Sequence, residues 1–133
     1  MMEKEFLIPF NKSAQFQHEN QTWERLLEFL KQENAFLKNR LSEVLDHNTN
    51  KDFLPQAEHY QNLFIVKDEF MDEMRHDVHE QETALKKMTA TVKESIDNKL
   101  VKMQEKLRNE MEFLEKDFVK IKNEFNKYLL SIG

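Results

Sequence analysis

The sequence predicts an all-α protein, an elongated antiparallel three-helix bundle with coiled-coil-like packing. Apolar residues recur at helical intervals in three long segments of similar length. Among the 133 residues there is one glycine, at the last position, and there are two prolines, Pro9 and Pro55. The residues that build tight turns and sheet bends are therefore nearly absent. A chain of this size forms one domain and buries a modest core without cross-links.

The first helix is expected over residues 13–47. Apolar residues there form the seam of a packed helix. They are Phe16, Trp23, Leu30, Leu37 and Val44, seven residues apart, with Leu27 and Leu41 between them. The interleaved seam positions carry Asn20, Asn34 and Asn48. An amide at a seam position commonly lowers stability while fixing register or partner number; alternatively, the bundle is too wide there to bury all three.

The second helix is expected over residues 55–88. The preceding segment, HNTNKDFLP, interrupts the pattern, and Pro55 fits only the first turn of a new helix. The apolar seam that follows is spaced alternately by three and four residues. Its members are Ala57, Tyr60, Phe64, Lys67, Met71, Met74, Val78, Gln81, Leu85 and Met88.

The third helix is expected over residues 92–131. After Met88 the apolar spacing slips, and Thr91 with Glu94 forms a capping box, so we place a helix break near Thr89 to Thr91. The seam then runs through Met103, Leu107, Met111, Leu114, Phe118, Ile121, Phe125 and Tyr128. The alternative is a helical hairpin with one very long C-terminal helix, which would need a second chain to cover it and would form an obligate dimer.

Residues 1–12 are expected to form an extended N-terminal arm before the bundle domain, residues 13–133. Its apolar patch, Phe6 to Phe10, is short and follows two acidic residues, so it does not read as a secretion signal. The patch would fold over the bundle end or act as a docking peptide. No apolar run approaches the roughly 20 residues that a membrane span needs. Since the chain has no cysteine, a cytoplasmic location is expected.

Charge is unevenly distributed along the chain. Residues 1–85 carry 9 Lys/Arg against 17 Asp/Glu, and residues 86–133 carry 11 against 8. The two parts should therefore attract each other. The C-terminal part mixes acidic residues among its lysines, so a nucleic-acid surface is not expected. A further hypothesis is that the lysines near the second turn dock on an anionic polymer or membrane surface; they are Lys86, Lys87, Lys93, Lys99 and Lys102.

Catalytic chemistry is not expected. Nucleophile elbows, phosphate-binding loops and dinucleotide fingerprints all need internal glycines, and the only glycine here is Gly133. The sequence therefore favours a non-enzymatic adaptor or assembly protein without a cofactor, which forms a homo-oligomer through apolar helix faces.

A second line of apolar residues beside the seam carries that interpretation. Folding at the two turns should bring Phe36 level with Val66 and with Phe113 and Leu114. One reading is a buried aromatic layer; the other is that part of the line stays exposed and binds a partner. The candidate contact residues are Leu26, Phe29, Phe36, Leu63, Val66 and Phe70, with Asn34 setting the register.

The stretch EMRHDVHE supports an alternative function as a metal-binding bundle. Its candidate ligands are Glu73, His76, His79 and Glu80. On an ideal helix, Glu73, His76 and Glu80 form a ridge roughly opposite the seam, and the other helices offer no matching Glu-x-x-His pair. Solvated surface residues are therefore the simpler interpretation of this stretch.

Overall fold

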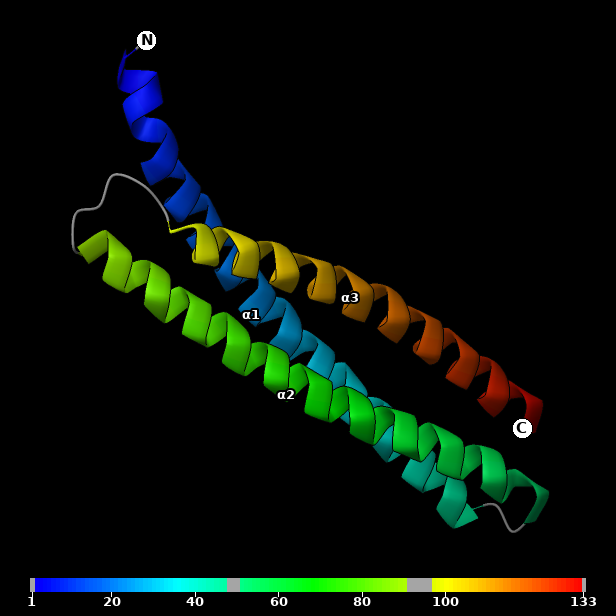
Figure 1. The fold of residues 1–133 in the computed structure, drawn as a ribbon. Helices are drawn as coiled ribbons and strands as arrows, with labels where there is room; N and C mark the ends of the chain where they lie inside the picture. The colour runs from blue at the N-terminus through cyan, green and yellow to red at the C-terminus, as the bar shows by residue number, and fades with distance from the viewer. Residues whose placement is uncertain (1, 48–50, 91–96, 133) are drawn as a thin grey trace.

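The computed structural model describes residues 2–47, 51–90 and 97–132, which form three long helices and one short 3-10 helix. In order these are α1 (Met2–His47), η1 (Lys51–Phe53), α2 (Leu54–Ala90) and α3 (Asn98–Ile132). Figure 1 shows that α2 runs back along α1 and that α3 reverses again, so α3 is parallel to α1. No strand occurs in the described ranges. The chain is thus an all-α three-helix bundle, as predicted.

The third helix folds back on its own chain. α2 ends at Ala90, Asp97 is not helical, and the Asp97 carboxylate accepts a hydrogen bond of 3.0 Å from the Lys99 backbone N–H at the start of α3. At the other end of α3, the Tyr128 hydroxyl donates to the Phe53 carbonyl at 2.9 Å. One continuous helix from residue 55 is therefore excluded. The Thr91 and Glu94 capping box lies outside the described residues.

The first helix begins at Met2, so residues 2–12 are helical and do not form the expected extended arm. Glutamate, lysine and leucine in this segment favour a helix, and the one hydrogen bond that Pro9 removes does not end it. Figure 1 shows this part of α1 extending past the end of the bundle. The side chains of the Phe6 to Phe10 patch are outside the described part of the chain.

The predicted seams of α1 and α2 form the core. Most of their apolar members are buried, and Tyr60, Val44 and Met88 are partly buried. Each fully buried Leu, Met or Phe side chain contributes about 1.5–3 kcal/mol relative to exposure. On α3 the seam holds from Leu107 to Tyr128, but Met103 is 38% exposed and its neighbour Gln104 is fully buried in its place.

An aromatic layer lies at the η1 end of the bundle and not at the expected level, where Phe36, Val66 and Phe113 are exposed. Phe64 and Phe125 meet edge to face with ring centroids 5.0 Å apart, and Tyr60 lies 5.2 Å from Phe125. Phe53 stacks on Tyr128 at 5.1 Å. Aromatic pairs in such geometries add about 0.5–1.5 kcal/mol beyond the area they bury. This layer packs the first turns of α2 against the last turns of α3.

The level of α3 is shifted from the expected one. Asn34 binds the Phe64 carbonyl, so Phe36 does lie near the level of Val66. On α3, however, Lys67 pairs with Asp117 and Phe64 contacts Phe125, which puts Phe113 off that level. The physical reason is the longer connection: the described α3 begins at Asn98, whereas the sequence pattern predicted residue 92.

Candidate functional site

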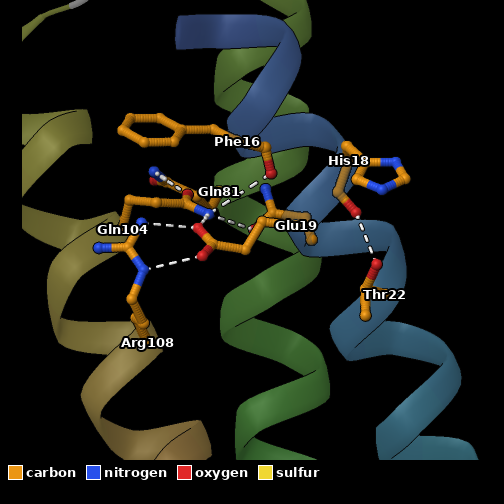
Figure 2. Close-up of polar contacts among 8 residues, drawn as sticks. Phe16, His18, Glu19, Thr22, Gln81, Gln104 and Arg108 are labelled. Carbon is orange, nitrogen blue, oxygen red and sulfur yellow. Dashed lines mark hydrogen bonds and ion pairs between the residues drawn. The ribbon is translucent and has the colours of Figure 1, made fainter.

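A layer of polar side chains crosses the bundle near the N-terminal half of α1. Gln104 is at its centre: its Nε2 donates to Glu19 Oε1 and to Asn20 Oδ1, both at 2.9 Å, and lies 3.4 Å from the Phe16 carbonyl (Figure 2). Its Oε1 accepts from Gln81 Nε2 at 3.1 Å. We call this group the polar layer; its members are Glu19, Asn20, Gln81, Glu82, Gln104 and Arg108.

All three helices meet in the polar layer. Asn20 Nδ2 on α1 donates to Glu82 Oε2 on α2 at 3.0 Å. Gln81 on α2 also donates to the Leu100 carbonyl on α3 at 2.8 Å. Glu82 is buried, and its Oε1 has no hydrogen-bond donor among the described residues, with Lys86 Nζ 4.0 Å away. Because an unpaired buried polar group is costly, sliding one helix past another would break several of these contacts together.

Glu19 and Arg108 form a charged pair at the rim of the polar layer. Burial raises the pKa of the Glu19 carboxyl, but hydrogen bonds from Arg108 and Gln104 and the positive charge of Arg108 outweigh burial, so this pKa lies below its ordinary value. The hydrogen bond to Glu19 in turn raises the pKa of Arg108. Glu19 is therefore ionised at neutral pH.

Asn34 makes a second polar contact, nearer the middle of the bundle. It is fully buried, and its Nδ2 donates to the Phe64 carbonyl at 2.8 Å and to Asp68 Oδ1 at 3.1 Å. Burial raises the pKa of the Asp68 carboxyl, but hydrogen bonds from Lys38 and Asn34 and the charges of Lys38 and Lys31 bring it below its ordinary value. Asn34 thus fixes α1 against α2 inside one chain and offers no surface to a partner.

The other candidate contact residues lie on α1 and α2 and do not form one continuous exposed surface. Phe29 and Phe36 are 54% and 63% exposed and lie on α1 beside α3. Val66 is exposed on α2, while Leu26, Leu63 and Phe70 are only partly buried in the bundle. Lys67 Nζ lies 5.9 Å from the Phe70 ring and 5.5 Å from the Phe113 ring, on the α2 side of α3.

Phe29 and Phe36 line a groove between α1 and α3. Lys122 Nζ on α3 pairs with Glu33 Oε2 on α1 at 3.2 Å in this groove. We call it the α1/α3 groove; it is lined by Phe29, Gln32, Glu33, Phe36, Leu37, Lys122 and Asn126. Two exposed phenylalanines seven residues apart therefore lie on one helix face beside a groove.

The histidines of EMRHDVHE lie in a different groove, between α1 and α2. It is lined by Gln21, Glu24, Arg25, Glu28, Arg75, His76 and His79. His76 is 70% exposed in its side chain, and its Nε2 lies 3.7 Å from Glu80 Oε1. In the described ranges, no three His, Asp or Glu side chains come together in a way that could hold a metal ion. The groove sets two arginines beside two glutamates, so it has no excess of negative charge to attract a cation.

The remaining surface candidates are lysines near the connection between α2 and α3. Lys86, Lys87, Lys99 and Lys102 are exposed, and Lys93 is outside the described residues. Over the part of the chain that the structure describes, none of the helices is both long and apolar enough to cross a lipid bilayer.

The sequence pattern did not reveal the hydrogen-bonding side chains at the centre of the polar layer. Gln104 sits one position after Met103 in a seam that reads as continuous, and Glu82 and Arg108 look like ordinary surface charges. One signal was available. The amide at seam position Gln81 and the one at Asn20 each require a buried hydrogen-bond partner on a facing helix.

No family model, curated protein or solved structure matches this chain.

Proposed function

We propose that the chain is a non-enzymatic adaptor or assembly protein that forms homo-oligomers through apolar side chains on its outer helix faces. The observation that carries this proposal is the exposure of Phe29 and Phe36 at the α1/α3 groove. Large apolar side chains grouped on a surface are typical of sites that bind another protein.

The interior offers support of a different kind. Its polar groups are largely paired with one another across the three helices, in the polar layer and at Asn34. Such contacts hold the helices in register, and a rigid helix face binds with a smaller loss of conformational entropy. A cytoplasmic setting fits a sequence of 133 residues with no cysteine.

The test is the molar mass in solution, measured by light scattering over a concentration series. We expect the wild-type protein to be oligomeric and Phe36→Glu to weaken association by about 30-fold or more, since a buried aromatic anchor contributes about 2 kcal/mol. Helicity by circular dichroism should be retained, because Phe36 is exposed in the monomer.

Phe113→Glu is the matched control. Phe113 is 61% exposed but lies on the α2 side of α3. Its substitution should leave the molar mass unchanged. A wild-type protein that stays monomeric at every concentration would rule out the proposed self-association, and loss of helicity in Phe36→Glu would assign that residue to the core.

A further inference from the structure

A line of exposed residues runs along the outer side of α1. We call it the α1 stripe and define it as Ala14, His18, Thr22, Arg25, Phe29 and Phe36, which are spaced by four, four, three, four and seven residues. This is the spacing of a helix-packing seam. Only Arg25 among the six carries a formal charge with histidine neutral, in a chain that is 34% charged. The bundle leaves this seam uncovered.

The α1 stripe contains both a projection and a hollow. Phe29 projects from it with 54% of its surface exposed. About two to three helical turns earlier, the surface is hollowed between α1 and α3. The hollow is lined by Ala14, Gln15, Phe16, His18, Glu19, Thr22, Trp23 and Arg108. Figure 2 shows His18 and Thr22 on the side of α1 that points away from Gln104, and both residues are exposed.

We propose that two copies of the chain pair through their α1 stripes, antiparallel about a two-fold axis, with Phe29 of each copy seated in the hollow of the other. This inference rests on the proposed function and names its partner. The two-fold axis passes between the two α1 helices, at a level midway between Thr22 and Arg25. This places Phe29 of one copy opposite His18 of the other. It also places Gln15 opposite Gln32. A two-fold contact of this kind is closed and uses the same surface twice.

The polar residues fit this direction of pairing. Thr22 of one copy meets Arg25 of the other, and the same two groups already interact within one chain, where Arg25 Nη2 lies 3.4 Å from Thr22 Oγ1. Gln15 and Gln32 are neutral amides that both donate and accept hydrogen bonds. A parallel pairing would instead set Phe29 of one copy against Phe29 of the other and leave the hollow empty.

The length of α1 is also consistent with this pairing. α1 starts at Met2 and extends past the end of the bundle (Figure 1). The same axis brings Phe36 of one copy level with residue 11 of the other, where α1 is still helical. The two helices then overlap over residues 11–36, or about 39 Å at 1.5 Å per residue. The second Phe in the stripe therefore also meets a helix.

The natural absence of cysteine allows a direct test by disulfide cross-linking. Gln15→Cys and Gln32→Cys proteins are mixed and oxidised under mild conditions. We expect the mixture to give a cross-linked dimer in several-fold higher yield than either protein alone, because a disulfide forms only when the two Cα atoms are within about 7 Å. Gln15→Cys mixed with Gln56→Cys, an exposed position on α2, is the control and should not cross-link.

Two substitutions of Phe29 complete the experiment. In the cysteine background, Phe29→Glu should abolish the cross-link and Phe29→Leu, which keeps an apolar projection, should retain it. A wild-type oligomer whose Gln15→Cys and Gln32→Cys mixture does not cross-link would overturn this arrangement and leave the proposed function standing. A cross-link between two Gln15→Cys chains would also overturn this arrangement, because the proposed axis keeps the two copies of residue 15 apart. A wild-type monomer at all concentrations would remove the proposed function itself.

Discussion

Arg108 holds the Glu19 carboxylate with two hydrogen bonds, each 2.8 Å long, from Nε to Oε2 and from Nη2 to Oε1. The two residues are 89 positions apart in the sequence. This bidentate pair joins the N-terminal half of α1 to α3, and both arginine geometry and charge favour it. It closes the outer edge of the polar layer, whose buried members are three amides and the Glu82 carboxylate.

Acid should weaken the bundle through Glu19. The pKa of the folded Glu19 carboxyl lies below its ordinary value, so its contribution to the free energy of unfolding is complete above that ordinary value and is lost as pH falls through the folded pKa. We expect Glu19→Gln to cost about 1 kcal/mol at pH 7, a discounted value because the Arg108 side chain is partly exposed. The cost should shrink toward pH 3. Urea unfolding followed by Trp23 fluorescence measures it.

Glu24→Gln is the control for that measurement, since Glu24 is an exposed glutamate on the same helix. The free energy of unfolding of the Glu24→Gln protein should change with pH as that of the wild type does. An equal loss for Glu19→Gln at pH 3 and pH 7 would contradict a role for the ionised carboxylate.

Replacement of Gln104 should destabilise the bundle through the groups that it leaves unpaired. Gln104→Leu removes the donor to the buried Asn20 Oδ1, and we expect a loss of about 1–3 kcal/mol in the free energy of unfolding. The double mutant Asn20→Leu, Gln104→Leu should lose less free energy of unfolding than the sum of the two single mutants, because the two amides are hydrogen-bonded to each other. Strict additivity in a urea double-mutant cycle would show that they are independent.

Truncation in the aromatic layer should be much more costly than truncation on the surface. Phe125 is fully buried and contacts Phe64 and Tyr60, so we expect Phe125→Ala to lose about 3–5 kcal/mol. Phe113→Ala changes the same residue type on the same helix at an exposed position and should stay within about 0.5 kcal/mol of wild type. Similar losses in chemical denaturation would contradict the assigned core.

Metal content distinguishes the proposed function from the metal-binding alternative. We expect protein purified without a histidine tag to contain no stoichiometric zinc, iron or manganese, because the described residues bring no three potential ligands together at His76 and His79. Elemental analysis of wild-type and His76→Ala protein measures this. Stoichiometric metal that disappears in His76→Ala would instead support the alternative.

The sequence predicted the parts of the fold that depend on local periodicity. The seams of α1 and α2, and α3 from Leu107 onward, follow apolar spacing. Of the two interpretations left open for the seam amides, the burial of Asn20 and Asn34 agrees with the one in which they fix the register, while Asn48 lies outside the described residues. The level of α3 depends on the length of a connection that has no glycine or proline to mark its ends. Gln104 was missed because a polar residue beside a continuous apolar seam looks solvent-facing until its partners, 84 and 85 positions away, are known.

The exposed phenylalanines show the limit of periodicity more directly. Phe29, Phe36 and Phe113 have the residue type of a core and the spacing of a helix face, yet each remains open to solvent. Whether such a residue is covered depends on where the third helix lies across the other two. That is a property of the assembled bundle, so a single-helix pattern does not determine it.

Because α3 runs in the same direction as α1, the start of α1 and the end of α3 lie at opposite ends of the bundle (Figure 1). A helix of the length of α3, 35 residues, spans about 50 Å. Two cargoes fused before Met2 and after Ile132 would be held apart by at least that distance, with the bundle acting as a stiff spacer. A two-helix hairpin of the same rods would bring both attachment points together.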